Sequence, residues 1–449
     1  MKQRHLTAAA AAVIIAGVAA CGSTSAPPAS SSSSSSSAGT PTASASTAPA
    51  PVTLEVWLMS GSAPASLVSA WNNEFQQKYP NVTVHVDLQQ WTGIVTKTET
   101  ALATSAPPDV LEMGNTYVAS FAATGGLADL SSVSWPNQST WLQSLQEAGT
   151  YSSKLYGVPY YAGDRIAIYN QTIFNKAGIS SPPTTTDDLL SDCAKIKAAE
   201  PSGTSCLYIP GEYWYAMFSF LFGESGNATS AIATSSGGTW SGGFSSSADQ
   251  TGLNWVYDNL FKTGYDLAPA TQNDTTTTTN TIIEKGQAAI IVEPGWDYGS
   301  IVSDLQKSNP DNVQLGSFAL PGYSSSAPMP TFLGGSNLGV AAKSPNQQYA
   351  EDYIQLVTDN DYESQMATVG GVIPNSTTLL GLQAENPPLN TAAQAAQTSW
   401  FTPNTPQEAT LENNNVYENL LGAIFSGQQS ASAAASTADS TIASTLNGS

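Results

Sequence analysis

Basic residues are scarce in this chain of 449 residues. Lysine and arginine together number 13, against 34 aspartate and glutamate residues, so the formal charge is −21. A surface of this sign repels the phosphates of nucleic acids and the headgroups of anionic lipids, and we therefore expect no nucleic-acid partner. The charge is compatible with a preference for cationic ligands, and equally with the acidity that keeps many exported proteins soluble.

Histidine and cysteine are also rare, with two and three residues. Beyond the first few residues the only imidazole is His85, which lies in the middle of a predicted strand. His85, Cys193 and Cys206 have no recognisable metal-ligand spacing, so we expect no metal. The sequence also has no Gly-x-Ser-x-Gly elbow and no phosphate-binding loop, and we expect no cofactor.

Long apolar runs are confined to the start of the chain. Lys2 and Arg4 precede an apolar segment at 8–20 that is too short to span a bilayer and has the layout of a secretion signal. The sequence Val-Ala-Ala-Cys-Gly at 18–22 resembles a bacterial lipoprotein box, with Val18 in place of the common leucine. This resemblance implies a signal peptide at 1–20 and a lipidated Cys21, carrying palmitate, that holds the protein at a membrane surface. A chance apolar leader ending in cysteine is the alternative.

The residues after Cys21 have the composition of a tether. From 22 to 51 they are almost all Ser, Ala, Thr, Pro and Gly, including a serine run at 30–37, with no charge and no large apolar group to bury. We predict a flexible tether at 21–51, with a root-mean-square span of about 30 Å. If Cys21 carries lipid, Cys193 and Cys206 remain as a pair in an oxidising compartment, which predicts a structural disulfide.

The remaining 400 or so residues alternate between strand and helix patterns. Alternating apolar residues predict strands at 52–59 and 82–88, and Leu67, Trp71 and Phe75 are spaced as on one helical face. A further helix at about 93–105 and a strand at 109–113 follow. A capping box at Ser344, Pro345 and Gln347 predicts a later helix, and the C-terminal third reads as mostly helical. The pattern is that of an α/β protein.

The order of several motifs resembles the extracellular solute-binding proteins of carbohydrate ABC importers, of the maltose-binding-protein-like family 1. Five stretches over about 330 residues carry the likeness: Tyr-Pro-Asn at 79–81 with Trp91, Pro-Asp-Val at 108–110 and 126–130; 154–160 with 168–170, 174–178 and 182–183; 284–289 with Gly295-Trp296; 320–322; and 334–335 with 343–345 and 371–374. One departure is Thr186, which stands where the family commonly has a tryptophan.

The resemblance implies a type II periplasmic-binding-protein-like fold. Each of two lobes is a mixed sheet flanked by helices, and the ligand cleft lies between the lobes. Mapped through the motifs, lobe 1 comprises 52–165 plus 289–329, and lobe 2 comprises 170–288 plus 332–449. The chain crosses between the lobes near 164–169 and near Pro330.

The same resemblance implies a function. Such a protein captures a sugar or oligosaccharide, and closure of the cleft on the ligand is the signal that the permease subunits of an ABC importer read. We expect a monomer on the extracellular face of the cell membrane, lipid-anchored, in a Gram-positive organism.

Candidate ligand-binding residues include several aromatic side chains, because apolar sugar faces stack on aromatic rings. Trp296, beside Gly295 in a strand-to-helix turn, is the first candidate, with packing inside a lobe as its alternative. Tyr160 and Tyr161 stand where the second motif enters the hinge. Tyr213 and Trp214 either line the lobe 2 wall or belong to its core.

Polar residues and glycines complete the set. Asp164 and Arg165 either face the cleft or form a hinge ion pair without ligand contact. Glu112 and Asn115 follow the third strand, at the edge where open α/β sheets bind ligands, unless they form an ordinary surface loop. Gly334 and Gly335 permit close backbone approach to a ligand or make a simple turn, and Ser60 follows the first strand.

Other functions are consistent with parts of the sequence. A glycoside-acting enzyme needs two carboxylates at a fixed separation, and Glu112, Asp164, Glu293 and Asp297 are candidates, but no pair has a defined spacing. We therefore expect that the protein is not an enzyme. A surface adhesin fits the tether but not the order of motifs. A binding protein of the same fold for a polyamine or peptide is the alternative that the acidic residues favour.

Overall fold

A computed structural model describes residues 49–200, 203–225, 232–274, 276–308, 314–323 and 328–448. The predicted signal peptide, Cys21 and the tether up to residue 48 lie outside these ranges.

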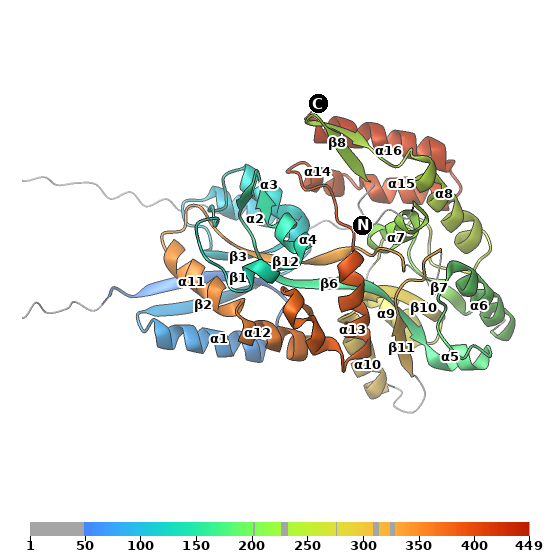
Figure 1. Ribbon diagram of the computed structural model, residues 1–449, viewed down its shortest axis with the longest axis horizontal. Helices are drawn as coiled ribbons and strands as arrows, with labels where there is room; N and C mark the ends of the chain where they lie inside the picture. Colours follow the sequence, from blue (N-terminus) through green and yellow to red (C-terminus); the bar gives the residue numbers. More distant parts are fainter. Residues whose placement is uncertain are drawn as a thin grey trace, which may run out of the picture. The chain divides into compact units, whose positions relative to one another are not determined.

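The described part is organised around one large mixed β-sheet. It has nine strands in the order β2-β1-β3-β12-β6-β10-β7, with β11 and β13 also paired to β6 (Figure 1). The two pairs β4-β5 and β8-β9 form separate two-stranded sheets. The strands are β1 (Val52–Met59), β2 (Val82–Gln89), β3 (Val110–Gly114), β4 (Thr150–Tyr151), β5 (Lys154–Leu155), β6 (Val158–Asn170), β7 (Ser205–Tyr208), β8 (Ala233–Ser236), β9 (Thr239–Gly242), β10 (Ala288–Pro294), β11 (Leu315–Phe318), β12 (Leu333–Val340) and β13 (Ile373–Pro374).

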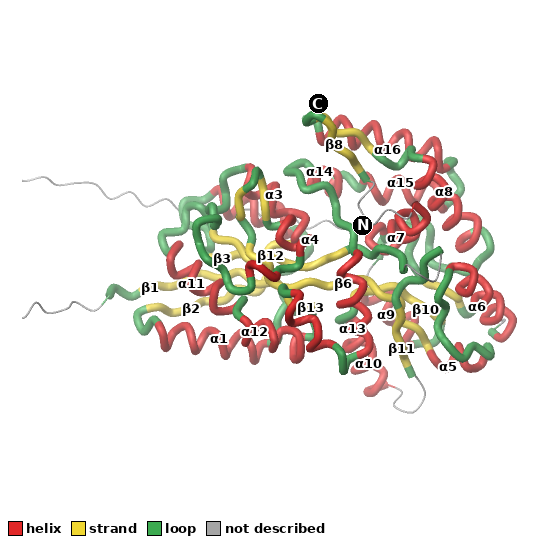
Figure 2. The backbone as a smooth tube through the Cα atoms, viewed as in Figure 1, coloured by secondary structure: helices red, strands yellow, loops and turns green. Residues whose placement is uncertain are grey.

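Helices flank the sheet, and those after β12 dominate the C-terminal third (Figure 2). The helices are α1 (Ala65–Lys78), α2 (Ile94–Ala103), α3 (Val118–Ala123), α4 (Gln143–Ala148), α5 (Gln171–Lys176), α6 (Thr186–Ala199), α7 (Trp214–Ser225), α8 (Ser247–Val256), α9 (Thr276–Glu284), α10 (Asp297–Ser308), α11 (Gln347–Val357), α12 (Asn360–Gln365), α13 (Pro387–Ala395), α14 (Glu408–Asn413), α15 (Val416–Phe425) and α16 (Ala431–Leu446). Among the described helices, none is long and apolar enough to cross a membrane.

The first elements confirm the strand and helix patterns of the sequence. β1 and β2 pair in parallel over their whole length, and β1 continues the sheet to β3. The predicted apolar face of α1 is buried, because Leu67, Trp71 and Phe75 are at most 5% exposed. Local periodicity was sufficient here because each pattern is long and uninterrupted.

The predicted capping box at Ser344 is wrong. Helix α11 begins at Gln347, and its N-cap residue is Asn346, without a side-chain cap. The Ser344 hydroxyl instead donates to Asp109 Oδ1 at 2.5 Å and accepts the Asn346 backbone N–H at 2.9 Å. A tertiary partner therefore takes the side chain that the local motif assigned to the helix, although the predicted buried face of α11 is present.

Strand pairing places two segments differently from the expected lobe boundaries. Residues 289–329 were expected with lobe 1, but β10 lies between β6 and β7 and pairs with both. Residues 332–449 were expected with lobe 2, but β12 lies between β3 and β6 and is antiparallel to both. Both strands are almost fully buried and lack the alternation of apolar and polar residues that marks a half-buried strand, so their local sequence carries no signal of which neighbour they pair with.

Strand β6 connects the two ends of the sheet. Its first half pairs with β12 and β13, and its second half pairs with β10 and β11. One apolar core surrounds β1, β2, α1 and α11, whereas another, rich in aromatic rings, surrounds α7, α8, α15 and α16. The predicted crossing near 164–169 thus falls within a continuous buried strand.

The predicted disulfide between Cys193 and Cys206 is confirmed. It joins α6 to β7, with both cysteines buried against the aromatic core. The two residues are 13 apart in sequence. Closing a loop of this length stabilises the folded state by about 3 kcal/mol in the chain-entropy model.

Candidate functional site

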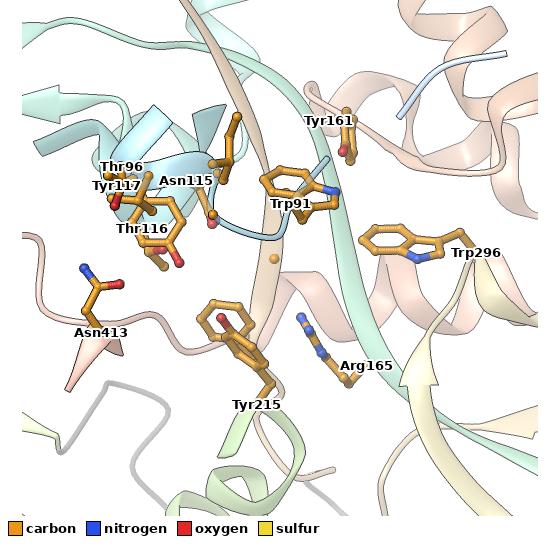
Figure 3. Close-up of a pocket in the computed structure, with 17 residues that line it drawn as sticks. Trp91, Thr96, Asn115, Thr116, Tyr117, Tyr161, Arg165, Tyr215, Trp296 and Asn413 are labelled. Carbon is orange, nitrogen blue, oxygen red and sulfur yellow. The ribbon is translucent and has the colours of Figure 1, made fainter. Parts of the chain in front are cut away.

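A cavity of about 490 Å³ lies where both ends of the sheet contribute residues (Figure 3). Its volume is in the range of small-molecule sites. Aromatic rings and uncharged polar groups dominate its walls, with one guanidinium. The lining residues are Trp91, Gly93, Ile94, Val95, Thr96, Gly114, Asn115, Thr116, Tyr117, Tyr161, Arg165, Tyr215, Trp296, Phe332, Gly334, Gly335 and Asn413.

The alternation of β6 decides which of its residues reach this cavity. Side chains point to opposite faces at successive positions of a strand. Tyr161 and Arg165 line the cavity, whereas Tyr160 and Asp164 are fully buried and do not. The sequence predicted that all four side chains bind the ligand. The alternation of the strand directs one pair into the cavity and the other pair to the opposite face.

Trp296 lies directly over the backbone of β6. A Cβ atom at Gly163 would come within 1.6 Å of Trp296 Cζ3, so only glycine leaves room for the indole. The ring also meets Tyr161 edge to face, with 6.2 Å between centroids. Residues of β6 therefore make both contacts with the Trp296 ring, and the indole has a fixed place in the cavity wall.

We expect Gly163→Ala to lower ligand affinity at least tenfold without touching the ligand. The added methyl group would force the Trp296 ring out of its position. The measurement is calorimetric titration with whichever ligand binds the unmodified protein. Gly299→Ala is a matched control because a Cβ there meets no atom within 4 Å. Equal affinities of both variants would show that the position of Trp296 is irrelevant to binding.

Glu112 holds the Tyr161 side chain in place through a hydrogen bond. Its carboxylate accepts the Tyr161 hydroxyl at 3.1 Å, the Ser62 hydroxyl at 2.7 Å and the Met59 backbone N–H at 2.7 Å. Burial raises the pKa of Glu112, while these hydrogen bonds oppose the rise. The carboxylate does not line the cavity, so its contribution is to orient the Tyr161 ring.

The two glycines of β12 form part of the cavity wall in an extended strand, and the predicted alternative of a simple turn is wrong. A Cβ at Gly335 would lie 2.3 Å from the Tyr161 carbonyl oxygen, and the φ angle of Gly335 is +141°. A Cβ at Gly334 would lie 2.8 Å from Arg165 Nη1. Close approach of β6 and β12 therefore requires glycine at position 335, whereas a side chain at position 334 would displace the Arg165 guanidinium.

Arg165 is held in an aromatic enclosure. Its guanidinium carbon lies 4.7 Å from the centre of the Tyr215 ring and 5.1 Å from that of Phe332. Nε donates to the Tyr213 hydroxyl at 3.3 Å, and that hydroxyl donates to Glu293 at 3.4 Å. Among the described residues no carboxylate forms an ion pair with Arg165, so the predicted hinge ion pair with Asp164 is absent.

A second cavity of about 380 Å³ adjoins the first at Arg165. Trp91, Tyr215, Trp296 and Arg165 line both cavities. The second is more acidic, because two carboxylates line it. An amide side chain also lines it. Its other lining residues are Tyr213, Asn273, Asp274, Pro294 and Asp297.

Several predicted site residues lie outside both cavities. Trp214 is 2% exposed and packs among aromatic rings, in accordance with its core alternative. Gly295 faces α13, where a Cβ would meet Ala392 at 2.9 Å. Ser60 is exposed and lines neither cavity. Asn115 does line the first cavity, while its side chain donates to the Leu333 carbonyl at 3.0 Å.

The lining residues that the sequence did not predict include four aromatic rings and an amide. Trp91 follows the carboxyl end of β2 and could have been found by the rule that predicted Asn115, since loops at that edge converge on ligands. Tyr117 lies two residues after Asn115, beyond the end of the same strand, so the same rule applies to it. The other three carry no local signal, because they reach the cavity through tertiary packing: Tyr215, Phe332 and Asn413.

Burial raises the pKa of Asp164 to about 7, although the Arg165 backbone N–H donates to it at 2.8 Å. Between about pH 4 and pH 7 the folded protein retains a proton that the unfolded chain has lost. Stability is therefore greatest below this window and falls as pH rises through it, by about 1.4 kcal/mol for each pKa unit between the two states.

We expect Asp164→Asn to reduce this pH dependence, because the amide keeps an acceptor oxygen and never ionises. The measurement is urea unfolding at pH 5 and pH 8. The free energy of unfolding should differ less between the two pH values in the variant than in the unmodified protein. An unchanged difference would contradict the assignment to Asp164.

A sequence model described as bacterial extracellular solute-binding protein matches residues 60–364. The diacetylchitobiose binding protein DasA of Streptomyces coelicolor is 32% identical over 385 residues, which cover 85% of this chain and 87% of that protein.

Solved structures with the same fold include two sugar-related binding proteins. The GacH receptor of Streptomyces glaucescens, studied unliganded and with acarbose, superposes with a TM-score of 0.75 at 20% identity, covering 89% of this chain and 99% of that one. The sugar-binding protein MalE of Xanthomonas citri gives 0.73 at 19% identity, covering 88% and 97%. The expected α/β fold of the two-lobe binding proteins is confirmed.

Proposed function

Because the chain belongs to the bacterial extracellular solute-binding proteins, we propose that it captures a sugar or short oligosaccharide and delivers it to an ABC importer. The single observation that carries the ligand class is the wall of the larger cavity. It combines the rings of Trp91, Trp296 and Tyr215 with uncharged polar groups such as Asn115 and Asn413. Stacking faces and neutral hydrogen-bonding groups are what a pyranose requires.

The relative DasA supports this ligand class, since it is named for a disaccharide of N-acetylglucosamine. Two of the four candidate carboxylates give no support to an enzyme. Glu112 is occupied by three hydrogen bonds and Asp164 lies on the opposite face of β6, so neither presents a free oxygen to a bound sugar.

The experiment is thermal unfolding of the purified protein with mono- and oligosaccharides, using polyamines and short peptides as comparison ligands. A ligand at about 100 times its dissociation constant adds about 2.7 kcal/mol to the free energy of unfolding. Stabilisation by an oligosaccharide series is the expected result. Stabilisation by polyamines alone would favour the cation-binding alternative, which the acidic second cavity suggests, and no stabilisation would contradict a binding role for these classes.

We also propose that Cys21 carries the lipid that anchors the protein to the outer face of a single membrane, beside its permease. We expect Cys21→Ser to release most of the protein into the medium, because lipid is the only anchor that the sequence implies. Fractionation of cells that express each form measures this. Ser37→Ala, within the tether, should stay with the membrane. Retention of the Cys21 variant after washing would contradict the anchor.

A further inference from the structure

Arg165, which lines both cavities, has an unused donor atom. Arg165 is 8% exposed, its guanidinium lines both cavities, and buried Nη1 has no hydrogen-bond acceptor. An unpartnered buried donor is costly, since it loses water without gaining a partner. In Figure 3 the guanidinium extends from β6 toward the space between Tyr215 and Trp296. A ligand atom that accepts hydrogen bonds would satisfy it there.

Acceptors face the same space from other elements. Asp297, at the first position of α10, and Asp274, before α9, both line the second cavity with Asn273. Thr279 donates to Asp274 Oδ1 at 2.6 Å, and the Asn273 amide donates to Glu418 at 3.1 Å. Asp297 has a hydrogen bond with the Asn280 side chain, and burial, chiefly, raises its pKa to about 7. A carboxyl group has several acceptor sites, so Asp297 can also accept from a ligand N–H.

A donor and an acceptor that line one small cavity select a ligand group that has both an acceptor atom and a donor atom. We propose that the second cavity is a subsite for the acetamido group of an N-acetylated sugar, with Arg165 donating to the carbonyl oxygen and Asp297 accepting from the N–H. This proposal rests on the proposed function, because it presumes that a sugar ring occupies the larger cavity. The volume of about 380 Å³ leaves room for the methyl group beside Pro294 and Trp91.

Other substituents match the cavity less well. A carboxylate would pair with Arg165, but it would lie beside the acidic groups of Asp274 and Asp297, which repel it when they are ionised. A protonated amine would suit those carboxylates but would leave the guanidinium without an acceptor. A hydroxyl is smaller than the space provided. The acetamido group is neutral, carries both required atoms and has an apolar end.

The test uses three disaccharides that share one skeleton and linkage and differ at carbon 2. These are diacetylchitobiose, its deacetylated diamine and cellobiose, which carry acetamido, amine and hydroxyl groups. Calorimetric titration should give at least tenfold tighter binding for diacetylchitobiose than for cellobiose. The preference should fall to less than threefold in Arg165→Met and in Asp297→Ala. Lys307→Met, an exposed position on α10, should keep the full preference.

The ratio of affinities, rather than affinity alone, separates a subsite from a general loss of folding. Thermal unfolding of each variant checks that the protein is folded, and Asp297→Ala remains informative if Arg165→Met is not.

Equal binding of diacetylchitobiose and cellobiose would overturn the subsite and leave the proposed function intact. Tightest binding of the diamine would overturn it in favour of an ammonium site. A preference that both variants retain would overturn its location. Binding of none of the three would count against the subsite, and if the wider saccharide panel also fails, the proposed function fails with it.

Discussion

Replacing Trp296 with alanine should weaken ligand binding at least tenfold while the protein stays folded. The indole forms a wall shared by both cavities, and its place over Gly163 and beside Tyr161 is set before any ligand arrives. A ring held in advance loses little conformational freedom on binding, so its stacking energy contributes almost fully to affinity. Tenfold corresponds to about 1.4 kcal/mol, which is within the range expected for an aromatic contact with its buried area.

Calorimetric titration with the saccharide that binds best measures this effect. Trp240→Ala is the matched control, because Trp240 lies in the β8-β9 hairpin and lines neither cavity. The control should bind as the unmodified protein does. Unchanged affinity in Trp296→Ala would remove this residue from the site.

Replacing Trp214 with alanine should produce the opposite pattern, a large loss of stability. Trp214 is 2% exposed and contacts the rings of Tyr215, Phe332 and Tyr417, with centroids 3.8 to 5.7 Å away. Removal of a buried tryptophan leaves a cavity that the neighbouring rings cannot fill. Substitutions of this kind cost about 3 to 5 kcal/mol of folding free energy.

Urea unfolding at neutral pH measures that cost. Trp91→Ala is the comparison variant, because Trp91 is 44% exposed and its loss leaves no buried void. We expect it to change the free energy of unfolding by less than about 1 kcal/mol. A similarly small change in Trp214→Ala would show that Trp214 is not a core residue.

Local patterns in the sequence predicted the elements that depend on local causes. The alternation in β1 and the spacing of Trp71 and Phe75 in α1 each follow from one buried face. The pairing of β10 and β12 could not be predicted in this way. A strand buried on both faces has no alternating pattern whichever neighbours it has, and its position depends on chain topology.

The candidate site shows the same division. Trp296, Tyr161 and Arg165 were predicted and line the cavity. They could be predicted because Trp296 lies at a strand-to-helix turn, and the other two lie where a family motif enters the predicted hinge. Asp164 was predicted with them, but its neighbouring position in β6 directs it to the other face. Tyr215 and Asn413 come from α7 and the end of α14, and only the packing of these helices brings them to the cavity.

We expect the cavity beside Trp296 to hold a sugar. A crystal structure of the protein with the saccharide that stabilises it most would test this. We expect a pyranose ring stacked on Trp296, with Tyr215 and Asn115 in the same cavity and a substituent near Arg165. A saccharide bound elsewhere on the protein, with this cavity filled only by water, would contradict it.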